Sequence, residues 1–158
     1  MNAEDLTLGI LYRPNQSAIS GIQRGEEIVK LLLVVSAILA CLFGLMLILI
    51  PDKFYEPAGI AMTPMMATIA QAHGATLIGL GVINWFARNA DRQGLIAVCT
   101  GNLVVQVLSL LVVLRTMQLG AGSAVAPGIA IHVILGALFG YFLAKLKRDF
   151  RGGVTSGM

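Results

Sequence analysis

The sequence predicts an all-α polytopic membrane protein whose four transmembrane helices form an up-down bundle. The 158 residues are 57% hydrophobic and only 12% charged, whereas about a quarter of the residues in a soluble domain are charged. The apolar residues gather into four segments, each with about the 20 residues that cross a ~30 Å hydrocarbon core. The length suits one compact unit, which we divide into an N-terminal segment (1–28), a transmembrane domain (29–146) and a C-terminal tail (147–158).

The first predicted span covers residues 29–50. The polar segment before it lacks the basic start, short apolar core and cleavage site of a removable signal peptide, and residues 20–30 are expected to be helical. Within the span, Ser36, Ala40 and Gly44 recur every four residues, which places small side chains on one face for close helix contact. Pro51 is expected to end the span because proline clashes with the preceding turn.

The second predicted span, 64–86, carries polar residues inside its apolar run. Thr63 and Pro64 indicate its start, as a helix N-cap followed by proline in the first turn. Trp85 is expected to anchor its other end at the membrane interface. The polar residues within it are Gln71, His73 and Asn84.

The third and fourth predicted spans, 95–114 and 127–144, also carry polar or small residues at helical spacing. The third presents a polar stripe at Asn102, Gln106 and Ser109, and the fourth repeats His132, Gly136 and Gly140 every four residues. Such stripes form hydrogen bonds between helices and allow close backbone approach. The residues after Arg151 are expected to form a disordered tail.

The distribution of lysine and arginine predicts the orientation. Nine basic residues fall on the side that holds both termini and the turn after the second span, and two fall on the other side. Positive charge stays on the cytoplasmic side, so both termini are expected in the cytoplasm, with the chain in a bacterial inner (plasma) membrane. The nine are Arg13, Arg24, Lys30, Arg88, Arg92, Lys145, Lys147, Arg148 and Arg151, and the two are Lys53 and Arg115.

Several function classes are disfavoured. No charged residue lies within the four span cores, whereas proton pumps and ion-coupled carriers usually keep one there. No hydrolase elbow, P-loop or dinucleotide fingerprint occurs, so we expect no catalytic residues and no enzyme. A basic stripe with interleaved aromatics is missing, which argues against nucleic acid as a partner.

Cys41 and Cys99 lie deep in apolar segments and are interpreted as small core hydrophobes.

The two histidines permit two interpretations. His73 lies nine residues after Pro64 and His132 five after Pro127, so the rings lie ~14 Å and ~8 Å into helices that start on the same side. Adjacent axes ~8–10 Å apart give a diagonal of roughly 13 Å, which suits two axial ligands of a haem or other tetrapyrrole. Alternatively, each imidazole is neutral and bonded to Gln71, Thr76, Asn102 or a backbone carbonyl, or contacts a quinone or lipid headgroup. A metal site built from protein ligands alone is disfavoured, since zinc needs three or four.

The glycine placement and the topology resemble a known family. The pattern covers about residues 30–145 and resembles the small bacterial four-span membrane proteins grouped with DoxX. The resemblance implies a four-helix membrane bundle and transfers no catalytic residue. It rests on Pro51, Asp52, Phe54, Gly59, Gln71, His73, Gly74, Gly79, Gly81, Asn84, Trp85, Ala87, Arg88, Gly101 and Asn102.

These observations favour a non-enzymatic bundle embedded in the lipid bilayer, acting as an accessory or structural subunit beside other membrane subunits or further copies of itself. This hypothesis rests on the small-residue faces of three helices and on the absence of charged residues from the span cores. One alternative is a small haem- or pigment-binding redox protein that uses His73 and His132. A second is a small-molecule-binding or transporter-like bundle that uses Gln71, Asn102 and Gln106.

Overall fold

The computed structural model describes residues 16–121 and 125–155, and within these it contains helices and no strand. Four helices are long: α2 (Gln16–Leu49), α4 (Pro64–Ala87), α5 (Arg92–Thr116) and α6 (Ala126–Thr155). Each lies along a stretch long and apolar enough to cross a membrane, at Gln23–Leu49, Pro64–Ala87, Arg92–Gly120 and Ala126–Arg148, of which the third continues past the end of α5. The predicted all-α polytopic fold is confirmed.

Local sequence signals set where the helices begin. The Thr63 hydroxyl accepts a hydrogen bond from the Met66 amide at 3.3 Å and Pro64 occupies the first turn, which confirms the predicted start of α4. The Asp91 carboxylate caps α5 in the same way, accepting from the Gly94 amide at 2.8 Å. From the sequence, this region was expected only to be a turn, although aspartate is among the preferred N-cap residues.

The connection between α2 and α4 is itself helical. Helix α2 ends at Leu49, as predicted, and Pro51 then opens the short helix α3 (Pro51–Tyr55), because proline needs no N–H partner in a first turn. A 3₁₀ turn, η1 (Glu56–Ala58), follows and closes at Gly59 with φ of 69°. That left-handed conformation favours glycine.

Helix α6 extends beyond its predicted end. The sequence predicted a disordered tail after Arg151, but the helix continues to Thr155. Adding a residue to an existing long helix fixes one residue for one hydrogen bond, so extension costs little even through Gly152 and Gly153. The turn before α6 is the π-helical segment η2 (Met117–Ala121), in which Gly120 has a φ of 106°.

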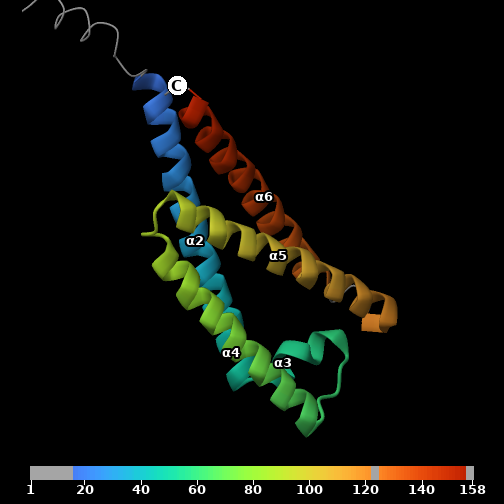
Figure 1. Cartoon of the computed structure of the whole chain (residues 1–158). Coiled ribbons are helices and arrows are strands. Elements are labelled where there is room, and N and C mark those ends of the chain that lie inside the picture. Colours follow the sequence, from blue (N-terminus) through green and yellow to red (C-terminus); the bar gives the residue numbers. More distant parts are fainter. Residues whose placement is uncertain (1–15, 122–124, 156–158) are drawn as a thin grey trace, which may run out of the picture.

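The four helices form two antiparallel pairs that diverge from one end of the molecule (Figure 1). Helices α2 and α4 pack along their length, as do α5 and α6, and we call these pairs the first and second limbs. The limbs meet where α2 passes the C-terminal half of α6 and where α4 leads into α5. We call this the basic end, because it carries Arg24, Lys30, Arg88, Arg92, Lys145, Lys147 and Arg148.

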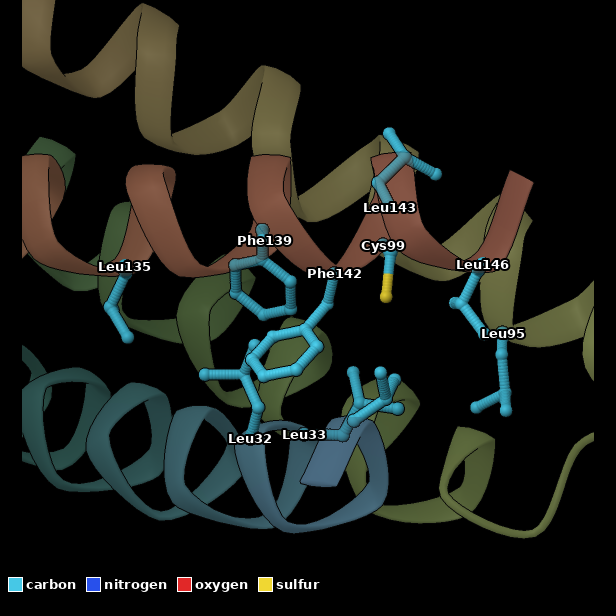
Figure 2. Packing of buried hydrophobic residues seen from close by; sticks show 10 residues of the cluster. Leu32, Leu33, Leu95, Cys99, Leu135, Phe139, Phe142, Leu143 and Leu146 are labelled. Atoms are coloured by element: carbon cyan, nitrogen blue, oxygen red, sulfur yellow. The ribbon is translucent and has the colours of Figure 1, made fainter. Parts of the chain in front are cut away.

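A hydrophobic core joins the limbs near the basic end (Figure 2). Side chains from α2, α5 and α6 interdigitate there, and Phe139 points toward α2 with none of its surface exposed. Cys99 belongs to this core and is fully buried, whereas Cys41 is half-buried on α2, and both are free thiols. The core consists of Val29, Leu32, Leu33, Leu95, Cys99, Leu135, Phe139, Phe142, Leu143 and Leu146.

Candidate intramembrane site

A reciprocal amide pair links the two limbs inside the membrane-spanning region. Asn84 of α4 donates its Nδ2 to Asn102 Oδ1 at 2.9 Å, and Asn102 donates its Nδ2 to Asn84 Oδ1 at 2.7 Å. The two side chains are 0% and 2% exposed. Asn102 Nδ2 also donates to the Val98 carbonyl within α5, at 3.0 Å. Because buried amides without partners are costly in an apolar medium, the pair fixes how α4 and α5 face each other.

A second polar pair, Gln106 with His132, lies within the second limb. Gln106 Oε1 is 2.7 Å from His132 Nδ1, and the glutamine side chain is buried. An amide oxygen only accepts hydrogen bonds, so Nδ1 carries the hydrogen and donates it. In the neutral imidazole the other nitrogen, Nε2, then has a free electron pair.

His73 lies on the opposite limb, on the face of α4 that carries Asn84. The two residues are eleven positions apart, about three helical turns, so His73 and Asn84 point in a similar direction. His73 is exposed, and within the described residues it makes no hydrogen bond. The two histidines belong to different limbs, His73 to α4 of the first and His132 to α6 of the second.

The polar residues that the sequence suggested as partners for the histidines are engaged elsewhere. Gln71 Nε2 donates to the Ile48 carbonyl of α2 at 3.2 Å, and the Thr76 hydroxyl donates to the Ala72 carbonyl of its own helix at 3.1 Å. Asn102 is bound to Asn84. Ser109, the last member of the predicted stripe, is half-buried one turn beyond Gln106. Within the predicted stripe, Asn102 and Gln106 therefore bond to different helices, Asn102 to Asn84 of α4 and Gln106 to His132 of α6.

The predicted small residues of α2 occupy the interface with α4, to different degrees. A Cβ on Gly44 would lie 2.6 Å from the Gly74 carbonyl oxygen, and a Cβ on Gly74 would lie 2.6 Å from the Gly44 oxygen. Ser36 is buried and donates its hydroxyl to the Leu32 carbonyl of the same helix at 2.8 Å, whereas Ala40 is half-buried. The backbones of the first limb therefore touch at Gly44 and Gly74.

Two glycines on α4, Gly74 and Gly81, lie in this contact, and neither was predicted as a packing residue. Gly74 lies four residues after the buried Ala70, a small-xxx-small spacing that signals a packing face. A Cβ on Gly81 would lie 2.6 Å from the Cys41 sulfur and 2.9 Å from the Ala37 oxygen.

The glycines of α6 have a different environment. A Cβ on Gly136 would lie 3.5 Å from Gln106 Cβ, and one on Gly140 would lie 3.8 Å from Leu103 Cδ1. These are ordinary van der Waals distances. Gly136 lies one turn from His132, so the absence of a side chain there leaves room for Gln106 beside the histidine.

The number of metal-binding side chains limits which metal ions this region could hold. Among the described residues there is no cluster of three or more histidine, cysteine, aspartate or glutamate side chains that could hold a metal ion. A zinc ion bound by protein alone needs three or four such ligands. Two imidazoles could complete the coordination only of a metal whose other ligands come from a cofactor.

Comparisons of the chain with family models, curated proteins and solved structures found no match. The resemblance to the DoxX group stays a prediction.

Proposed function

We propose that the protein is a non-enzymatic subunit of a membrane assembly and that it holds a transmembrane helix of another subunit in the groove between α2 and α6. The observation that supports this proposal is an open groove of about 440 Å³ between those helices. Leu32 and Phe142 of the core also line its wall, and it extends along α2 as far as Leu39.

The chemistry of the groove suits a transmembrane helix. All of its lining side chains are apolar, among them Leu31, Val35, Ile134 and Leu138. The α2 wall runs from Ile28 to Leu39, which is about three helical turns. Association of helices within a membrane depends on van der Waals packing, because lipid tails are as apolar as the side chains. A groove with walls on two helices offers a partner more packing contact than a single convex helix would.

The test uses photo-crosslinking residues in the full-length protein in its own membranes. Val35 and Leu138, at 43% and 38% exposure, lie in the groove, whereas Val112 on α5 is 65% exposed and lies outside it. We expect crosslinks from the two groove positions, but not from Val112, to one discrete membrane protein identified by mass spectrometry. Filling the groove with Leu138→Trp should remove both the crosslink from Val35 and co-purification of that protein. Crosslinks to lipid alone, or to a second copy of this chain, would refute a distinct partner subunit.

We infer further that both termini face the cytoplasm of a bacterial inner membrane. The support is the clustering of basic residues such as Arg24, Arg92 and Lys147 at one end of the limbs, with Lys53 and Arg115 toward the other. Reporter fusions at the C-terminus and within residues 118–126 should show the first in the cytoplasm and the second outside. The opposite pattern would contradict this orientation.

The small-molecule alternative has less support. The three amides it would use are each bonded within the chain: Gln71 to Ile48, Asn102 to Asn84, and Gln106 to His132. A substrate would have to displace these partners before it could bind.

A further inference from the structure

We propose that a second groove, between α2 and α4, holds an acyl chain of an anionic phospholipid whose phosphate lies at Arg88. This groove has a volume of about 290 Å³, and its walls include Ile38 and Leu42 of α2 and Val82 and Trp85 of α4. It shares no lining residue with the groove between α2 and α6. The lipid site therefore goes beyond the subunit role proposed above and does not depend on it.

The shape and chemistry of this groove suit an acyl chain. No residue that lines it carries a charged or amide side chain, and its α2 wall runs from Ala37 to Leu45, which is about 12 Å along the helix axis. The two helices are in close contact beside it, because a Cβ on Gly81 would lie 2.6 Å from the Cys41 sulfur. A helix with its side chains is about 10–12 Å across, whereas an acyl chain is a single row of methylene groups. The smaller of the two grooves therefore favours the thinner occupant.

One end of this groove carries side chains that are typical of the headgroup region. Trp85 lines the groove and is 43% exposed, and tryptophan is enriched where the hydrocarbon core meets the headgroups. The Arg88 guanidinium lies over the Trp85 ring, with its Cζ 3.8 Å from the ring centroid. Arg88 follows Trp85 by three residues, about 4.5 Å further along the helix axis. Trp85 thus places this end of the groove at the headgroup level and Arg88 at the level of the phosphates.

The charge of Arg88 is available to a ligand. Its Nη1 donates to the Trp85 carbonyl at 2.6 Å, and within the part of the chain that the structure describes it forms no ion pair. Neighbouring carboxylates are engaged elsewhere, since Asp91 caps α5 and Glu27 pairs with Lys30 at 3.1 Å. A guanidinium has five N–H donors, and its planar shape matches two oxygens of one phosphate. Arg88 therefore retains donors for a lipid phosphate.

A second cation lies at the same level on α2. A Cβ on Gly81 would lie 2.9 Å from the Ala37 oxygen, so the antiparallel register of the two helices brings Lys30 opposite Arg88. Lys30 also lies two turns from Ala37, on the same face of α2. Its ammonium group has three N–H donors, and Glu27 accepts from one of them. Both walls of the groove thus carry positive charge at this end, which is complementary to an anionic headgroup.

The test uses the fluorescence of Trp85, the only tryptophan in the chain. The full-length protein is reconstituted in bilayers that mix phosphatidylcholine and phosphatidylglycerol, with brominated acyl chains on one lipid or the other. Bromine quenches tryptophan at close range, so the ratio of the two quenching efficiencies reports which lipid lies beside Trp85. We expect phosphatidylglycerol to be preferred about five-fold, the effect of one basic residue near a membrane surface. Arg88→Gln should remove this preference.

Two matched controls separate the site from the general charge and apolar surface of the protein. Lys147→Gln removes the same charge at the basic end but on α6, and it should keep the preference. Val82→Phe fills the groove and should remove the preference, whereas Val112→Phe, on an exposed surface outside both grooves, should not.

Three results would overturn the proposal: equal quenching by the two lipids in the wild type, a preference retained in Arg88→Gln or Val82→Phe, or an equal loss in Lys147→Gln. Crosslinking from Val35 tests the other groove, so either proposal can fail while the other stands.

Discussion

Gly74→Ala is expected to destabilise the first limb by about 3 kcal/mol, the upper part of the range for overpacking a well-packed interface. The added Cβ would lie 2.6 Å from the Gly44 carbonyl oxygen and 3.0 Å from Leu47 Cβ. Neither atom is the end of a flexible side chain, so the two helices must separate. The shift would also disturb Gly81, whose Cβ position is blocked by Cys41 and Ala37. The measurement is thermal unfolding in detergent, followed by helical circular dichroism.

Gly79→Ala is the control, five residues further along the same helix. A Cβ at Gly79 would meet nothing within 4 Å, so this variant should be neutral or more stable by roughly 0.5–1 kcal/mol, the helix preference of alanine over glycine. Gly44→Ala should be as harmful as Gly74→Ala. The double variant should lose less stability than the sum of the two single variants, because both methyl groups crowd the same contact and one separation of the helices accommodates both. Equal melting temperatures for Gly74→Ala and Gly79→Ala would show that the backbones do not touch here.

The elements of the fold could be predicted from sequence because their signals are local. Four apolar runs of sufficient length define four spans, and Thr63 with Pro64 defines one helix start to the residue. Asp91 carries an equally local signal, since it is an N-cap residue directly before the helix that it caps. The helical course of residues 51–58 was harder to predict, because two prolines and three charged residues in this stretch suggest a loop.

The pairing of the helices could not be predicted in the same way. The small-residue faces around Gly44 and around Gly136 have the same spacing, yet only the first brings two backbones into contact. The residues of the polar stripes were identified, but their partners were not. Whether His132 meets Gln106 or Asn102 depends on how each helix is rotated about its axis. That rotation is set by packing between residues far apart in the chain, such as Leu33 with Phe139 in the core.

Asn84→Leu is expected to destabilise the protein by about 1–2 kcal/mol, because it leaves the Asn102 amide buried with its bonds to α4 lost. Interhelical hydrogen bonds in membranes average about 0.6 kcal/mol and reach about 1.7, and this pair has two, at 2.7 and 2.9 Å. The double variant Asn84→Leu/Asn102→Leu should recover part of the loss, because replacing both partners leaves no unpaired amide. Thr100→Ala, which removes an exposed hydroxyl bonded to its own helix, is the control.

The same asparagine variants should change the angle between the limbs. The amide pair, the core and an ion pair between Arg92 of α5 and Glu26 of α2 join the limbs near the basic end, and the limbs diverge beyond them (Figure 1). Spin labels at Met65 and Val112, both strongly exposed on α4 and α5, would report the separation of the two limbs. We expect a single narrow distance distribution in the wild type and a broader one in Asn84→Leu. An unchanged distribution would mean that the other contacts between the limbs set the angle, and that the buried amides only satisfy each other.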